Sequence, residues 1–124
     1  MRYKVWHIEQ KQWIHDELEI YISPDGEVVE YYSHAYELYK KDISHKVQIV
    51  RFTGLKDKNG TEIYEGDIVD CTARLDRGKL LVVFEDGEFR LKQQLDSYGH
   101  YAVRNFRKEV IGNIYEHPHL LMEE

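Results

Sequence analysis

One continuous run, residues 52–69, constrains the fold of this chain more than any other segment. Its Asn59-Gly60 pair is the dipeptide preferred where two successive residues take positive φ, so we expect the chain to reverse direction there. Glu65-Gly66-Asp67 then interrupts the β-favouring residues that follow, and Gly66 can turn the backbone without a Cβ clash. The run therefore predicts a tight turn, a short strand, a corner and the start of another strand.

The same residues favour a structural role for this run over a ligand-binding loop, because Gly, Asn and Asp mark turns for backbone reasons alone. At Gly66 we expect a positive φ or a backbone contact too close for a Cβ. The residues assigned to this structural motif are Thr53, Gly54, Leu55, Asn59, Gly60, Tyr64, Glu65, Gly66 and Asp67.

The run resembles the signature of the YopX family, small proteins of bacteriophages and prophages that carry a similar Thr-Gly-Leu-Lys-Asp and Ile-Tyr-Glu-Gly-Asp-Ile-Val block. Residues 2–6 are similar to the basic and aromatic opening of that family, and residues 110–118 are similar to its closing strand and tail. The resemblance implies phage ancestry and a mainly β fold, and it brings no catalytic residues with it. Residues 31–46 match no family feature, so we expect the particular character of this member there.

Strands are expected in the first half of the chain over 3–8, 12–14, 18–22, 28–32 and 47–52. Residues 18–22 show the period-two alternation of a half-buried strand, and 28–32 is expected to return antiparallel to it. Residues 33–41 are expected to form a short helix or an irregular crossover. Later strands are expected over 101–106 and 110–115, and His117-Pro118-His119 is expected to end regular structure.

Asp86-Gly87 predicts the clearest hairpin, with a two-residue loop. The facing pairs in that register are Phe84 with Phe89, Val82 with Leu91, and Glu85 with Glu88. The four apolar side chains then share one face of the hairpin, which we expect to be its core side. The two glutamates form a like-charge pair, which is mildly destabilising unless both point into water.

Short strands separated by turn signals every 8–12 residues or so predict a mainly β fold. We expect a small SH3-like barrel over about residues 52–115, packed with an N-terminal antiparallel sheet, and at most one or two short helices. The chain is interpreted as one domain, 1–124, with sub-parts at 1–51, 52–115 and a tail at 116–124. This is fold analogy and does not establish a function.

The 124 residues can bury roughly two-thirds of the surface that the unfolded chain exposes, so folding requires no metal or disulfide. A single cysteine, Cys71, excludes an internal disulfide and favours a reducing compartment, the cytoplasm of a bacterial host. In its apolar strand, Cys71 is expected to be a small buried hydrophobe rather than a nucleophile. No signal peptide or membrane span is recognisable, so no membrane association is expected.

Motifs of known catalytic chemistry are missing from the sequence: it has no Gly-rich phosphate loop, nucleophile elbow or Cys-x-x-Cys zinc spacing. We therefore expect no enzyme activity, cofactor or metal. His117 and His119 would project the same way in an extended segment, but no third ligand is marked and a solvated tail is favoured. The carboxylates at Asp57, Glu62, Glu65, Asp67 and Asp70 fit no EF-hand spacing.

A net charge of −6 disfavours nucleic-acid binding, because neutralising phosphates normally requires a basic excess or a basic face. One short cluster, Arg104, Phe106, Arg107 and Lys108, could combine stacking with phosphate contacts. The competing interpretation is a solvated strand edge guarded by charge.

Two classes of function remain. The favoured hypothesis is a non-catalytic protein interaction or adaptor module that binds a phage or host protein, or its own copy as a homo-oligomer, through exposed aromatic residues and an open sheet edge. The alternative is a nucleic-acid-associated phage accessory protein that uses the strip at residues 104–108.

Overall fold

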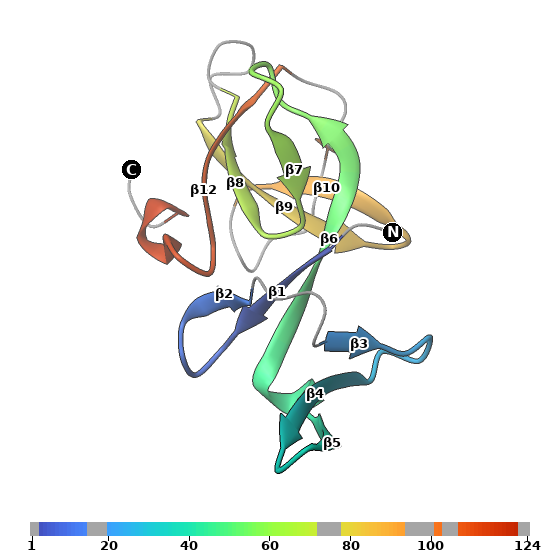
Figure 1. The fold of residues 1–124 in the computed structure, drawn as a ribbon. Coiled ribbons are helices and arrows are strands. Elements are labelled where there is room, and N and C mark those ends of the chain that lie inside the picture. Colours follow the sequence, from blue (N-terminus) through green and yellow to red (C-terminus); the bar gives the residue numbers. More distant parts are fainter. Residues whose placement is uncertain (1–2, 15–19, 72–77, 94–100, 103–106, 122–124) are drawn as a thin grey trace. The chain divides into compact units, whose positions relative to one another are not determined.

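The computed structural model describes residues 3–14, 20–71, 78–93, 101–102 and 107–121 (Figure 1). These ranges contain strands and two short 3-10 helices, and no α-helix. The strands are β1 (Tyr3–His7), β2 (Gln12–Ile14), β3 (Ile20–Ile22), β4 (Val28–His34), β5 (Glu37–Asp42), β6 (Val47–Lys56), β7 (Glu62–Tyr64), β8 (Asp67–Asp70), β9 (Lys79–Glu85), β10 (Glu88–Lys92), β11 (Tyr101–Ala102) and β12 (Glu109–Asn113). The 3-10 helices are η2 (Ser44–Lys46) and η3 (Pro118–Leu121). The mainly β fold expected from the sequence is confirmed.

The chain divides into two compact units. The C-terminal unit contains Met1–Tyr3 and Val50–Glu124, and the N-terminal unit contains Lys4–Ile49. Strand β6 begins in the N-terminal unit and continues into the C-terminal one. The assignment of residues 1–124 to a single domain stays a prediction.

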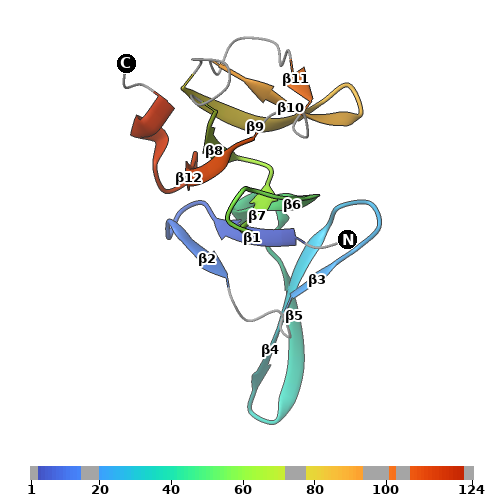
Figure 2. The same cartoon turned by 90° about the horizontal axis from the view of Figure 1, so that it is seen from above.

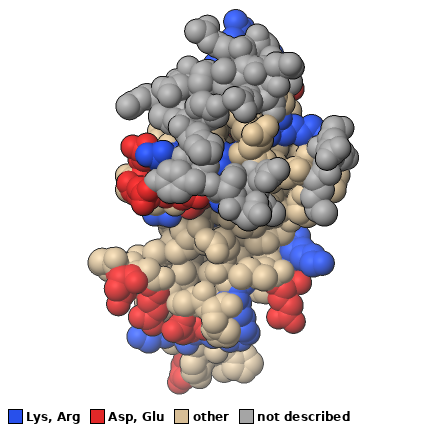
Figure 3. All heavy atoms as spheres, turned by 180° about the vertical axis from the view of Figure 1, so that it is seen from behind, with Lys and Arg blue, Asp and Glu red and all other residues tan. Residues whose placement is uncertain are grey.

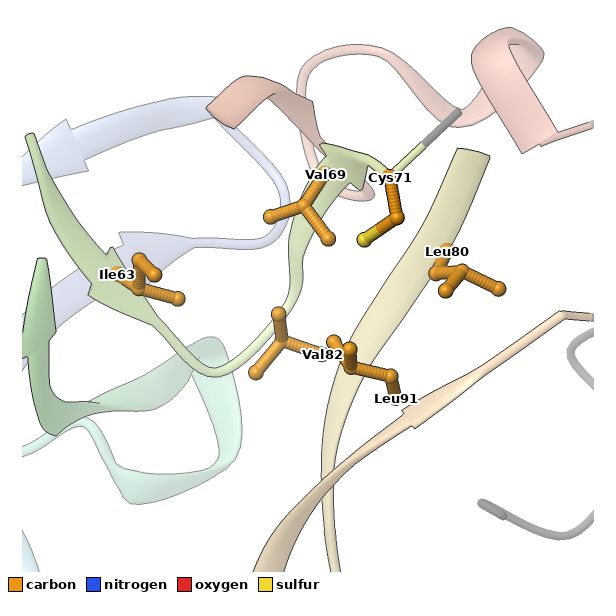
Figure 4. Close-up of a cluster of buried hydrophobic side chains, with 6 residues drawn as sticks. All are labelled: Ile63, Val69, Cys71, Leu80, Val82 and Leu91. Carbon is orange, nitrogen blue, oxygen red and sulfur yellow. The ribbon is translucent and has the colours of Figure 1, made fainter. Parts of the chain in front are cut away.

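The C-terminal unit is built on a five-stranded sheet in the order β11-β10-β9-β8-β12, with every adjacent pair antiparallel. β6 and β7 pair separately, with Phe52 opposite Tyr64. A cluster of buried side chains forms the core: Ile63, Val69, Cys71, Leu80, Val82 and Leu91 (Figure 4). The burial expected for Cys71 is confirmed, whereas the SH3-like closure of this unit stays a prediction.

The β9–β10 hairpin has the register that its sequence predicts. Asp86 and Gly87 both take positive φ, 52° and 79°, which is the type I′ geometry that suits the twist of the flanking strands. Phe84 lies opposite Phe89, and their rings meet edge to face at 4.9 Å between centroids. Val82, on the same face, is fully buried, whereas Phe84 at the end of the hairpin is 36% exposed.

The like-charge pair of this hairpin is neutralised from within the same strands. Lys92 Nζ lies 3.3 Å from Glu85 Oε1, and Arg90 Nη2 lies 3.0 Å from Glu88 Oε1. Each glutamate therefore has a cation beside it, which removes the destabilisation expected from the facing carboxylates.

The N-terminal unit contains the β1–β2 hairpin and a three-stranded antiparallel sheet in the order β3-β4-β5. The expected helix or irregular crossover over residues 33–41 is wrong: β4 continues to His34, turns through Ala35-Tyr36 and returns as β5. The sequence does not indicate this turn, because Ala35-Tyr36 contains no Gly, Asn, Asp or Pro, the residues that normally mark reversals.

The C-terminal tail also differs from expectation, because regular structure does not end at residues 117–119. Pro118 begins the 3-10 helix η3, which suits proline because its fixed φ matches the first helical position and its missing N–H has no helical partner there. The N–H of His117 donates to the carbonyl of Asn113 at 2.8 Å, which closes the preceding turn.

Candidate interaction surface

The turn at residues 57–61 is organised by one carboxylate. Asp57 Oδ1 accepts hydrogen bonds from the N–H groups of Asn59 and Thr61, both at 2.9 Å, and Oδ2 accepts from the N–H of Val110 at 2.9 Å. The chain reverses as predicted, but only Gly60 takes positive φ (85°), because the Asp57 side chain rather than a second left-handed residue shapes the turn. Burial opposes ionisation of Asp57, yet the three N–H donors outweigh it and lower the pKa of this carboxyl.

The corner at Gly66 shows both features expected there. Its φ is 89°, and a Cβ would lie 2.6 Å from Cε2 of Tyr115. The Gly66 N–H donates to Val82 O and its carbonyl accepts from Ile114 N–H, both at 2.8 Å. Asp67 Oδ2 accepts from the Tyr64 N–H at 2.8 Å, which holds the corner closed. These contacts give the corner an internal structural role.

Arg51 and Glu65 form a paired contact beside the corner. Arg51 Nη2 lies 3.0 Å from Glu65 Oε2, and Arg51 Nε donates to Glu65 Oε1 at 3.1 Å. This two-point geometry suits the planar guanidinium group. The guanidinium also lies 4.2 Å from the ring centroid of Phe84, a cation–π contact. The half-exposed end of the β9–β10 hairpin is therefore covered in part by a basic side chain.

The basic strip of the alternative hypothesis is only partly within the described residues. Arg104 and Phe106 lie outside them. Arg107 is exposed, whereas Lys108 is buried, and burial lowers the pKa of its ammonium group. Lys108 also contributes its carbonyl to the turn, accepting a hydrogen bond from the Lys58 N–H at 3.1 Å.

Potential metal ligands have other roles in the structure. His117 Nδ1 accepts a hydrogen bond from the Asn113 N–H at 3.3 Å, and its ring packs over Gly112, so this side chain is held in place. Glu65 binds Arg51, and Asp57 and Asp67 accept backbone N–H groups. Within the described ranges, no three His, Cys, Asp or Glu side chains are grouped so that they could hold a metal ion.

The hairpin of β4 and β5 exposes several large side chains to solvent. Every residue of β5 is exposed, and Leu38 is 73% exposed. β3 pairs only with the first residues of β4, up to Glu30, so the rest of the hairpin extends beyond it as a two-stranded ribbon (Figure 2). The exposed large side chains of the β3-β4-β5 sheet are Tyr21, Tyr32, Tyr36, Leu38 and Tyr39.

The tip of this hairpin has a strained backbone. Ala35 and Tyr36 take φ of 53° and 68°, the two positive values of a type I′ turn, although neither is a residue that adopts them readily. Tyr36 is fully exposed, so no packing of its ring compensates for the conformation. Strained backbone positions cluster at functional sites, so this turn is a candidate for a recognition site.

One face of the hairpin carries an aromatic pair with charges on either side. Tyr32 and Tyr39 lie opposite each other and stack with their ring centroids 5.7 Å apart and their planes at 22°. The Tyr39 hydroxyl donates to Glu37 Oε2 at 2.7 Å, and this bond raises the pKa of Tyr39. Lys41 shares the face, opposite Glu30.

The outer edge of β5 is open. β4 occupies one side of this strand, and no other strand of the described part of the chain pairs with it. The sequence predicts an open sheet edge but not its location, because residues 33–41 are expected to form a helix or crossover and not a strand. The available signal was the β-favouring Tyr31-Tyr32 and Tyr39 on either side of the turn.

The sequence pattern of the YopX protein family matches residues 2–122 of this chain. The chain belongs to the YopX family. No match is found among curated proteins. None of the helices in the described ranges is long and apolar enough to cross a membrane.

Two solved structures share the fold of this YopX family member. One is the crystal structure of protein EF1440 from Enterococcus faecalis, with 24% identity and a TM-score of 0.58, covering 97% of this chain and 96% of that one. The other is the crystal structure of protein yopX from Bacillus subtilis, with 24% identity and a TM-score of 0.59, covering 95% of each chain. Likeness at this level of identity concerns the fold alone.

Proposed function

We propose that this YopX family member is a non-catalytic protein-interaction module of phage or prophage origin that acts in the cytoplasm of a bacterial host. The β4–β5 hairpin carries the proposal. It presents Tyr36, Leu38 and Tyr39 to solvent, and every residue of β5 is exposed. Aromatic residues are enriched at protein interfaces because they bury large area at low cost in rotamer freedom.

The alternative function, nucleic-acid association, has weaker support. The net charge is −6. Among the described residues on the face seen in Figure 3, basic and acidic side chains are interspersed, whereas phosphate binding favours a continuous basic patch. Lys108, one of the four residues of the strip at 104–108, is buried. Arg107 is exposed, so its guanidinium is accessible to a phosphate, and this observation supports the alternative.

The proposal is tested by comparing two surface variants in the host cell. In the first, Leu38→Ser is combined with Tyr39→Ser. In the second, Ile111→Ser removes an exposed apolar side chain from β12 instead. Because all three positions are exposed, both variants are expected to fold, with stability changes within about 1 kcal/mol of the parent.

Tagged parent and Ile111→Ser are expected to recover the same specific protein after cross-linking, and the β5 variant is expected to lose it. If the parent and both variants recover the same set of proteins, the hairpin does not bind the partner.

A further inference from the structure

We propose that the partner of the β4–β5 hairpin is a second copy of this chain, joined edge to edge through β5 in an antiparallel register in which Tyr39 faces Tyr39 of the other copy. The inference rests on the proposed protein-binding function and names its partner. Three observations carry it: the open edge of β5, the direction of its free backbone groups, and the order of charges along the strand.

The free backbone groups limit the possible registers. His34 and Glu37 flank a two-residue turn, so they form a hydrogen-bonded pair, and such pairs alternate along an antiparallel ladder. The N–H and C=O groups of Leu38 and Lys40 therefore point away from β4, toward the open edge. A second β5 can pair only if its own even-numbered residues meet these positions.

The order of charges selects one register among those permitted. With Tyr39 on the two-fold axis, Glu37 of each copy faces Lys41 of the other, so two opposite-charge pairs flank two tyrosines. A shift of two residues in one direction places Lys40 opposite Lys40. A shift of two residues in the other direction separates Glu37 from Lys41 of the other copy, so neither charge pair forms. β5 is therefore self-complementary in the Tyr39-centred register, as an isologous two-fold contact requires.

The same register continues the side-chain rows that exist within one hairpin. Across β4 and β5, Tyr32 stacks on Tyr39 and Glu30 faces Lys41. In the dimer, the tyrosine row extends through both copies, and each Lys41 lies between Glu30 of its own chain and Glu37 of the other. Opposite-charge and aromatic neighbours across strands are the pairs that stabilise sheets.

Adjacent lysines on an edge strand ordinarily discourage pairing with other strands. On β5 they disfavour the register that places Lys40 opposite Lys40, whereas the Tyr39-centred register pairs each Lys41 with a Glu37. The contact is small, about four backbone hydrogen bonds and two ion pairs, so we expect a dissociation constant on the order of 10 µM.

Sedimentation equilibrium on charge variants tests the register. Glu37→Lys alone and Lys41→Glu alone each place like charges in both flanking pairs, so each is expected to weaken self-association at least about tenfold. An equimolar mixture of the two restores opposite charges in both pairs, and it is expected to form a heterodimer about as stable as the parent dimer. Rescue on mixing cannot come from a change in folding.

Lys40→Glu is the matched control. It changes the net charge by the same amount as Lys41→Glu and lies on the same strand, but its side chain faces Leu38 of the other copy. It is expected to keep the parental association. Lys40→Pro removes an N–H that points away from β4, so it is expected to keep the hairpin and abolish the dimer.

Cysteine cross-linking provides an independent measurement. Tyr39→Cys is expected to form a disulfide-linked dimer under mild oxidation, because a pair on the axis that exchanges no hydrogen bonds brings its side chains close. Leu38→Cys, adjacent but off the axis, is expected to cross-link far less. The native Cys71 is buried and does not compete.

A parent protein that stays monomeric at about 100 µM, ten times the expected dissociation constant, would overturn this inference. Loss of association in Lys40→Glu equal to that in Lys41→Glu, or no recovery on mixing, would overturn the register. If the parent is monomeric while the hairpin variant still loses a specific cellular protein, the proposed function stands and the self-pairing is wrong. If neither self-association nor a hairpin-dependent partner is found, both fail.

Discussion

At Gly66 a single added carbon is expected to have a large consequence. A Cβ at this φ of 89° is strained, and it would also overlap the Tyr115 ring, whose nearest carbon is 2.6 Å away. We expect Gly66→Ala to lower the free energy of unfolding by at least about 3 kcal/mol. Gly60→Ala is the control: its φ of 85° is similar, but nothing lies within 4 Å of its Cβ position, so it is expected to cost about 1–2 kcal/mol.

Urea unfolding of the two glycine variants measures the difference. Equal losses of unfolding free energy would show that the Tyr115 ring moves aside freely and that the cost comes only from placing a side chain at positive φ. Burial, assisted by the nearby Glu65 and Asp67 carboxylates, raises the pKa of Tyr115 to about 12, as expected for a ring packed against the corner.

Asp57 makes the stability of the C-terminal unit depend on pH. Because its folded-state pKa lies below the unfolded value of about 3.9, the stabilisation is present above that pH and is lost as the pH falls through the folded-state pKa. Asp57→Asn should cost about 2 kcal/mol at neutral pH, because charge-assisted hydrogen bonds are lost. It should also reduce the fall in stability that accompanies acidification below about pH 5.

Asp86→Asn removes the same charge from an exposed loop and is the control for Asp57→Asn. Unfolding by urea at pH 7 and pH 3 separates the two variants. If Asp57→Asn kept the full parental loss of stability at pH 3, the assignment of this acid sensitivity to Asp57 would be wrong.

At the scale of elements, the β9–β10 hairpin distinguishes its two phenylalanines. Phe89 packs against the buried core cluster, so Phe89→Ala is expected to cost about 3 kcal/mol through lost burial and a cavity. Phe84 is partly solvated, meets the Phe89 ring edge to face and lies beside the Arg51 guanidinium, so Phe84→Ala should cost about 1 kcal/mol. Thermal unfolding compares them, and an equal loss at both positions would contradict the packing of the hairpin.

The β4–β5 turn offers a gain of stability. Replacing Ala35-Tyr36 with Asn-Gly supplies residues that adopt the two positive φ values readily, so the hairpin should gain about 1 kcal/mol. Hydrogen exchange of the β4 and β5 amides is expected to slow accordingly. Unchanged or faster exchange would show that Ala35 and Tyr36 are not strained. A more stable hairpin that has lost its cellular partner would indicate that Tyr36 is retained for binding.

The sequence predicts the elements whose turns contain characteristic turn residues. It does not predict features that depend on contacts between residues far apart in the sequence. Asp86-Gly87 specifies both the turn and the register of β9 with β10, because the turn type sets strand pairing. Ala35-Tyr36 contains no such turn residue, so the sequence does not predict the hairpin that presents the candidate surface. The Gly66 corner is predicted from the sequence, whereas the Tyr115 ring that occupies the place of a Cβ there, 49 positions later, makes a tertiary contact that no local pattern reveals.

For the whole molecule, the charge balance predicts weak contact with nucleic acid. At a net charge of −6, with Lys108 buried, we expect single-stranded DNA to bind more weakly than about 10⁻⁶ M at physiological salt. A fluorescence titration over a range of salt concentrations measures this affinity. Nanomolar binding that disappears in a protein carrying Arg104→Ala and Arg107→Ala would instead support the nucleic-acid alternative.

Because the single thiol is buried, the rate at which a reagent labels Cys71 measures how often the C-terminal unit opens. The side chain is fully buried in the core of the five-stranded sheet, and burial raises the pKa of its thiol, so a maleimide reagent reaches it only when that sheet opens. The N-terminal unit contains no cysteine, so its own openings leave no trace in the labelling rate. Comparing the labelling rate of Cys71 with the hydrogen-exchange rates of the β4 and β5 amides would show whether the two units open together or independently.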